Sequence, residues 1–168
     1  MAKFTSFLKE TDLFYNLTAT QLEIVDSICE EKQFREDELI FPENSHEKEL
    51  YLIFRGQVDI YINPGLVSRS PVANARSEVI AHLLRGQSFG EVALVDEGVR
   101  SAGAKAASRD TILLQISRER LLNLCNSYPE LGYRVMYNLA QDLSQKIRNA
   151  DLKIREILLY QPHRSEPA

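Results

Sequence analysis

The spacing of apolar residues changes twice along this chain, and these two changes limit the folds that it can adopt. In the middle, short apolar-rich runs are separated by turn residues such as Gly56 and Pro64, which is typical of the strands of a sandwich, barrel or jelly roll. The runs are 38–41, 49–54, 58–62, 78–84 and 111–117. Both flanks show helical spacing instead. The sequence therefore predicts an α+β protein, mainly β, with helices before and after the strands.

The first helix is expected to begin after Thr18. Thr18 and Gln21 have the spacing of a capping box, in which each side chain accepts a hydrogen bond from the other residue's backbone N–H. Leu22, Val25 and Cys29 follow at helical spacing. We therefore expect this helix to include Cys29. Further along, residues 63–77 are rich in small, polar and turn residues and are interpreted as a long, mobile hairpin tip.

Two helices are expected after the last strand. The first begins at Ser117, a suitable N-cap, contains Cys125 and stops before Pro129. The second runs from 129 to 160, with one glycine, Gly132, in its first turn.

The long helix carries a heptad repeat of apolar residues, spaced by alternating steps of four and three. Its members, expected at a dimer interface, are Tyr133, Met136, Ala140, Leu143, Ile147, Ala150, Ile154 and Ile157. A strict 3.5-residue repeat favours a partner helix, so the sequence predicts a parallel homodimer. In that dimer Lys146 would face Asp151 of the other chain. Packing of the helix on its own domain is the alternative.

Composition argues against several functions. Cys29 and Cys125 are far apart and are expected to be buried free thiols, and the three histidines are isolated, with His82 inside a predicted strand, so no metal site is expected. No nucleophile–base pair is visible, so we do not expect an enzyme. The net charge of −4 does not favour nucleic-acid binding. No run reaches the about 18 apolar residues of a membrane span, and no signal peptide is seen, so a cytoplasmic protein is expected.

The stretch FGEVALVDEGVRSAGAKA, residues 89–106, holds the most informative chemistry. A helical turn after Gly90 would present free backbone N–H groups to an anion, and Arg100 can bind a phosphate through two parallel hydrogen bonds. Ionised Glu91 only accepts hydrogen bonds, which suits a sugar hydroxyl. The small residues 101–104 would let a ligand approach the backbone. These residues together describe a nucleotide pocket; the alternative is a loop closed by a Glu91–Arg100 salt bridge.

This stretch resembles the phosphate-binding cassette of the cyclic nucleotide-binding domain family, roughly Phe-Gly-Glu-Leu-Ala-Leu, a short loop and Arg-Ser/Ala-Ala. The matching residues are Phe89, Gly90, Glu91, Ala93, Leu94, Arg100, Ser101 and Ala102. The resemblance extends over nearly the whole chain, from the opening helix to the two C-terminal helices. It implies a double-stranded β-helix, or jelly-roll β-roll, with an N-terminal helix, a short helix after the roll and a long C-terminal dimerisation helix.

By this resemblance Glu91 would bind the ribose 2′-hydroxyl and Arg100 the cyclic phosphate, helped by backbone N–H groups near Ala93 and Ser101. The ligand-binding residues would be Phe89, Gly90, Glu91, Val92, Ala93, Arg100, Ser101, Ala102 and Lys146. The ligand would be cyclic AMP or cyclic GMP, with no metal or other cofactor. The long helix would cover the purine.

The chain departs from the family pattern in three places. Val99 stands where a proline is common, and Asn44, a residue that tolerates positive φ, stands where a turn glycine is frequent. The third departure falls on Lys146 and Ile147, where catabolite activators place a Thr-Ser pair that contacts adenine. Lysine only donates hydrogen bonds, so Lys146 suits guanine O6 or N7 better than the adenine amino group.

These observations divide the chain into a cyclic nucleotide-binding roll with flanking helices at 1–128, a long coiled-coil or lid helix at 129–160 and a tail at 161–168. The tail is too short for the helix-turn-helix domain of the family's transcription regulators, so this chain is expected not to bind DNA. We predict a cyclic nucleotide-binding regulatory module that couples ligand binding to movement of the long helix, and through it to a dimer contact or an unidentified effector protein. The alternative is a structural or interaction protein that keeps the fold without physiological ligand binding.

Overall fold

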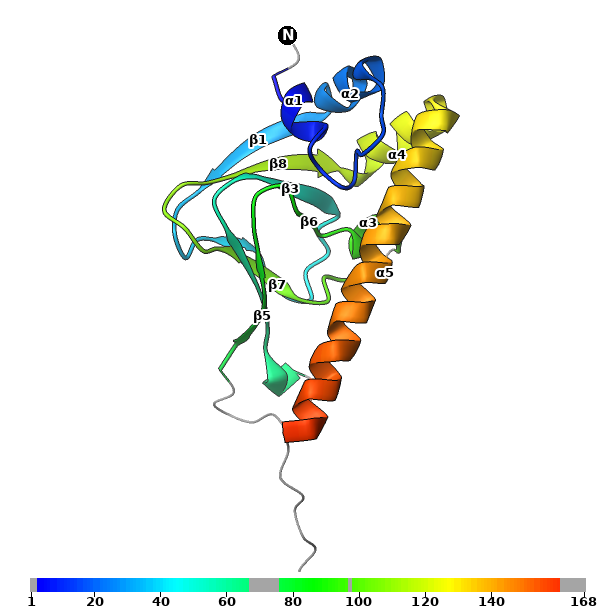
Figure 1. Ribbon diagram of the computed structural model, residues 1–168. Coiled ribbons are helices and arrows are strands. Elements are labelled where there is room, and N and C mark those ends of the chain that lie inside the picture. Colours follow the sequence, from blue (N-terminus) through cyan, green and yellow to red (C-terminus); the bar gives the residue numbers. More distant parts are fainter. Residues whose placement is uncertain (1–2, 67–75, 97, 161–168) are drawn as a thin grey trace, which may run out of the picture.

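The protein is a jelly-roll β-roll with helices at both ends of the chain (Figure 1). A computed structural model describes residues 3–66, 76–96 and 98–160. One antiparallel sheet contains, in order, β1 (Cys29–Phe34), β8 (Thr111–Ser117), β3 (Glu49–Arg55) and β6 (Ser88–Phe89). The other contains β2 (Leu39–Phe41), β7 (Gly103–Ala106), β4 (Val58–Ile62) and β5 (Glu78–Leu83). The predicted fold class is confirmed.

The five predicted strands correspond to β2, β3, β4, β5 and β8, and three further strands were not predicted. β1 has the polar sequence CEEKQF, β6 has two residues, and β7 has the sequence GAKA. Each is a strand because it pairs with a partner distant in the sequence, which local apolar spacing does not reveal. Of the expected hairpin tip, Pro64–Leu66 form the short 3₁₀ helix η1, while 67–75 lie outside the described residues.

The N-terminal helices are α1 (Thr5–Leu8) and α2 (Ala19–Asp26). The capping box predicted at Thr18 is confirmed, since its backbone N–H donates to Gln21 Oε1 at 2.9 Å and its hydroxyl accepts from the Gln21 N–H. The prediction that Cys29 belongs to this helix is wrong. Cys29 begins β1 and pairs with Ile116 of β8, because sheet formation outweighs its helical spacing.

The C-terminal helices are α4 (Arg118–Ser127) and α5 (Pro129–Tyr160), as predicted. Ser117 occupies the N-cap of α4, although its side chain makes no capping bond. A Cβ on Gly132 would lie 2.6 Å from the carbonyl oxygen of Cys125, so glycine permits the close approach of α4 and α5. Cys29 and Cys125 are half-buried free thiols, and burial raises the pKa of Cys29 to about 12.

Two apolar cores position the elements that carry the site. The first lies between the sheet that contains β3 and the helices, and it includes residues of α4 and α5 as far as Leu143. The second fills the roll and includes Phe41, Tyr51 and Phe89. The amide of buried Asn138 donates to the carbonyl oxygens of Leu13 and Tyr15 at 3.0 and 2.9 Å, which fixes α5 to the N-terminal segment. Beyond Leu143, the described part of α5 belongs to neither core.

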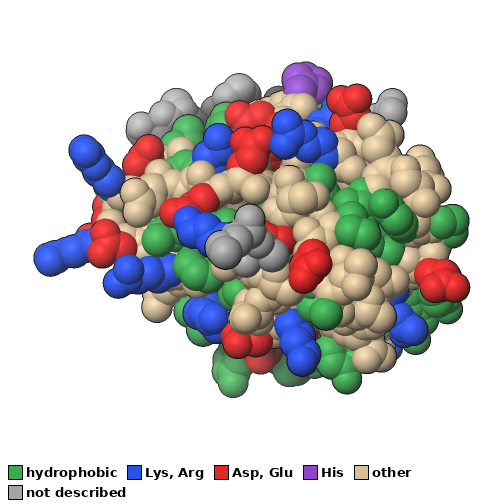
Figure 2. Space-filling view, turned by 90° about the horizontal axis from the view of Figure 1, so that it is seen from above, with side chains coloured by type: hydrophobic (Ala, Val, Ile, Leu, Met, Phe, Trp, Pro, Cys, Tyr) green, Lys and Arg blue, Asp and Glu red, His purple; other side chains and the backbone are tan. Residues whose placement is uncertain are grey.

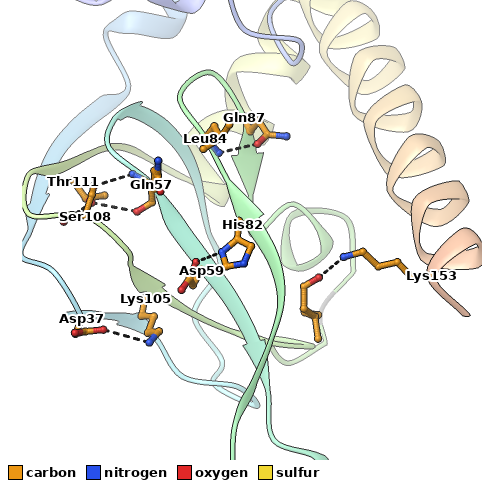
Figure 3. A network of polar contacts seen from close by, with 11 residues as sticks. Asp37, Gln57, Asp59, His82, Leu84, Gln87, Lys105, Ser108, Thr111 and Lys153 are labelled. Atoms are coloured by element: carbon orange, nitrogen blue, oxygen red, sulfur yellow. Dashed lines mark hydrogen bonds and ion pairs between the residues drawn. The ribbon is translucent and has the colours of Figure 1, made fainter. Parts of the chain in front are cut away.

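The surface of the roll carries scattered polar pairs (Figure 3). His82 of β5 contacts Asp59 of β4 at 2.7 Å, which confirms the strand position expected for His82. On the end of the molecule formed by α1 and α2, acidic and basic side chains are interspersed (Figure 2). Among the described residues, none of the helices combines the length and apolar composition that a bilayer span requires.

Candidate functional site

Two ionisable side chains predicted for the site are buried beside β6. Glu91 follows Gly90 and occupies the N-cap position of the short helix α3 (Val92–Val95) without a side-chain capping bond, and Arg100 lies after the loop that follows α3. The exposed fractions are only 6% for Glu91 and 3% for Arg100. Charged side chains are rarely buried to this degree unless they are paired or bind a ligand.

The guanidinium of Arg100 is held by the backbone. Its Nη1 donates to the carbonyl oxygen of Gly90 at 2.9 Å, and its Nη2 donates to that of Glu49 at 2.6 Å. The guanidinium carbon lies 4.1 Å from the centre of the Phe41 ring, a cation–π contact. Burial lowers the pKa of Arg100 from its ordinary value, and nearby Tyr51 and acidic groups oppose this, so the side chain stays charged. Its buried Nε donor has no hydrogen-bond partner among the described residues.

Gly90 makes this arrangement of Arg100 sterically feasible. Its φ of +82° is one that residues with a side chain rarely adopt. A Cβ at this position would lie 2.5 Å from Nη1 of Arg100 and 2.8 Å from the carbonyl oxygen of Glu49. A glycine is therefore needed both for the turn and for the contact with the arginine.

The backbone of Arg100 pairs with the turn after β2. Its N–H donates to Ser45 O at 2.9 Å, and its carbonyl accepts from the Asn44 N–H at 2.8 Å. Asn44 has a φ of +62°, as its tolerance of this conformation suggested. The Ser45 hydroxyl is buried and has no hydrogen-bond partner in the described structure.

Glu91 is paired with Lys146 of α5. Lys146 Nζ donates to Glu91 Oε1 at 2.9 Å and to Ser88 O at 2.9 Å, and it lies 2.8 Å from Asp142 Oδ2. Burial alone would lower the pKa of Lys146, but the charges of Glu91 and Asp142 and the hydrogen bonds to them raise it. The other oxygen, Glu91 Oε2, is buried without a hydrogen-bond partner among the described residues.

These contacts bear on two expectations. The Glu91–Arg100 salt bridge of the alternative interpretation does not form, because Glu91 pairs with Lys146 and Arg100 with two carbonyl oxygens. Within one chain Lys146 pairs with Glu91 and Asp142, so its ammonium does not depend on Asp151 of another chain for a partner.

The other predicted site residues have different surroundings. Phe89 is buried in the roll, where its ring stacks on Tyr51 with the ring centres 5.2 Å apart. Val92 and Ser101 are exposed, Ala102 is half-buried, and the backbone of Ala93 lies in α3.

The expectation that residues 101–104 are small to admit a ligand is wrong at Gly103 and Ala104. A Cβ on Gly103 would lie 2.3 Å from the Tyr61 ring, and Ala104 is fully buried in the roll core. The packing of Tyr61 of β4 explains the small size of Gly103, and Ala104 lies inside the core of the roll.

Two of the buried atoms that lack hydrogen-bond partners among the described residues have complementary chemistry. Glu91 Oε2 can accept a hydrogen bond from a hydroxyl, and Arg100 Nε can donate one to an anion. The model of the cyclic nucleotide-binding domain family matches residues 31–128. The chain belongs to this family. In this chain the matched residues extend from β1 to the end of α4 and include the cassette.

Other members are similar over much of the chain. The cyclic AMP receptor protein of Thermus thermophilus is 30% identical over 161 residues, which are 96% of this chain and 68% of that protein. The crystal structure of the Thermus thermophilus catabolite activator protein superposes with a TM-score of 0.71 at 29% identity, covering 88% of this chain and 63% of that one. Human cGMP-dependent protein kinase 2 is 26% identical over 77% of this chain, which is 16% of the kinase.

Sequence reasoning identified Glu91, Arg100 and Lys146 but missed the residues that hold them. Glu49 and Ser88 act through backbone carbonyls, which any residue type would provide. Asp142 stands four residues before Lys146, a helical ion-pair spacing that could have been recognised.

Proposed function

We propose that this domain binds a purine cyclic nucleotide, cyclic AMP or cyclic GMP, with Glu91 at the ribose hydroxyl and Arg100 at the phosphate. We further propose that binding repositions α5, and that the role is one of binding and regulation without catalysis. The observation that carries the proposal is that Glu91 Oε2 and Arg100 Nε are both buried without partners. Family membership supports the same assignment.

The energetics favour a ligand that satisfies both atoms. A buried polar group without a partner costs about 1–3 kcal/mol, and more when it is charged. A ligand with a hydroxyl at one end and an anion at the other recovers this cost by bonding to Glu91 and Arg100. A ribose with a cyclic phosphate has both groups in one rigid ring system.

The named relatives do not select one base, because one is a receptor for cyclic AMP and another is a kinase dependent on cGMP. The first test is therefore calorimetric titration of the protein with both cyclic nucleotides, and with linear 5′-AMP as the control. We expect saturable heat from at least one cyclic nucleotide and much weaker binding of 5′-AMP, whose phosphate carries more charge and is not held in the ring. Absence of heat from both at millimolar concentration would reject the proposal and favour an interaction protein that keeps the fold alone.

We also propose that the domain forms a parallel homodimer through α5. Support comes from the exposure of the C-terminal heptad residues: Ile147, Ile154 and Ile157 are 62%, 55% and 59% exposed. Tyr133, Ala140 and Ala150 are exposed as well. Met136 and Leu143 are half-buried and pack against their own domain, so they contribute less area to the proposed seam.

Ile154→Asp is expected to convert the dimer to a monomer, because a carboxylate cannot be buried without a partner in an apolar seam. Sedimentation velocity measures the change in mass. Asn149→Asp is the matched control: it adds the same charge away from the heptad positions, and it can still accept the hydrogen bond from Gln145. A monomeric wild-type protein, or an unchanged mass for Ile154→Asp, would contradict the proposed dimer.

A further inference from the structure

We infer that Lys146 is a positioning residue for hydroxyl recognition: it holds one oxygen of Glu91 and thereby leaves the other in place for the ribose 2′-hydroxyl of the ligand. This inference rests on the proposed function and assigns to Lys146 a role at the ribose rather than at the base.

The ammonium of Lys146 is held at the carboxylates. Lys146 Nζ donates to Ser88 O and Glu91 Oε1, both at 2.9 Å, and forms an ion pair with Asp142 Oδ2 at 2.8 Å. This arrangement favours a role at the carboxylate of Glu91 over the expected contact with guanine O6 or N7.

Lys146 also fixes which oxygen of Glu91 is free. Its ammonium lies 2.9 Å from Glu91 Oε1, and Glu91 Oε2 remains a buried acceptor without a hydrogen-bond partner among the described residues. Asp142, one helical turn before Lys146 on α5, holds the ammonium from the other side.

The same contact joins α5 to the cassette. Ser88 begins β6, just before Glu91, whereas Lys146 and Asp142 belong to α5, so the ammonium connects elements more than 50 residues apart. Lys153, two helical turns further along, donates to the carbonyl oxygen of Ile80 in β5 at 2.5 Å (Figure 3). Lys153 ties α5 to the roll without touching Glu91, which makes it the natural control.

The test measures the affinity for cyclic AMP and for 2′-deoxy-cyclic AMP in the wild type and in Lys146→Met, which keeps the length of the side chain but removes its donors. If cyclic GMP is the ligand of the wild type, its 2′-deoxy form is used instead. We expect the variant to lose about tenfold in affinity for the ribonucleotide, as expected for a charge-assisted hydrogen bond, and less than about twofold for the deoxynucleotide. Asp142→Asn should cause a smaller loss of affinity for the ribonucleotide. Lys153→Met should change the affinities for the ribonucleotide and the deoxynucleotide by the same factor.

Each outcome decides the question. Tighter binding of the ribonucleotide by Lys146→Met would show that Lys146 competes with the hydroxyl, and equal losses for both nucleotides would show that it only holds α5; either result overturns the inference while the proposed function stands. A wild type that binds neither nucleotide rejects the proposed function, and the inference with it. Lys146→Arg, which can still donate to Glu91, should restore the preference for the ribonucleotide.

Discussion

Replacement of Arg100 by alanine is expected to reduce the affinity for cyclic nucleotide by about 100-fold or more. The side chain is a buried cation with an unpaired Nε donor, and loss of a buried charge from a charge-assisted contact costs about 2–5 kcal/mol. The remaining pocket would leave the ligand phosphate without its cationic partner. Calorimetric titration measures the loss.

Arg100→Lys is the matched control, because it keeps the charge but not the planar fork. A lysine cannot reproduce the bonds to Gly90 O and Glu49 O while offering a further donor in the same plane, so we expect an intermediate affinity. Arg100→Ala also leaves the carbonyl oxygens of Gly90 and Glu49 without this donor. The free energy of unfolding should therefore fall by roughly 1–3 kcal/mol, which thermal unfolding measures. Undiminished binding by a folded Arg100→Ala protein would exclude Arg100 as the phosphate residue.

Gly90→Ala is expected to destabilise the fold by about 3 kcal/mol and to weaken ligand binding as well. The strained φ of a residue with a side chain costs about 1–3 kcal/mol, and the new Cβ would lie 2.8 Å from Glu49 O and 2.5 Å from the Arg100 guanidinium. Either the backbone or Arg100 must move. Chemical denaturation gives the first effect and titration with the nucleotide gives the second.

Gly86→Ala separates the effect of backbone strain from the effect of crowding against Arg100. Gly86 has a similar φ of +90°, but a Cβ there meets nothing within 4 Å. Its substitution should therefore cost only the backbone strain and leave ligand affinity unchanged. Equal effects of the two substitutions on stability and binding would show that crowding against Arg100 plays no part.

Local sequence was sufficient wherever neighbouring residues control the structure. The capping box at Thr18 and the uninterrupted helix 129–160 depend on residues within a few positions of one another. The alternating strand 58–62 depends on a two-residue period. The cassette could also be recognised, because Gly90, Glu91 and Arg100 lie in one short stretch whose residue types must match a ligand's chemistry.

Tertiary structure decided what those residues contact. The helical spacing of Cys29 gave way to pairing with β8, since a strand's hydrogen bonds come from a distant partner. Gly103 is small because Tyr61 of a neighbouring strand packs on it. Most important for the site, Glu91 finds its cation 55 residues away on α5. The sequence by itself determined which groups are available at the cassette, whereas only the packing of α5 on the roll determined that Lys146 occupies one oxygen of Glu91 and leaves the other free.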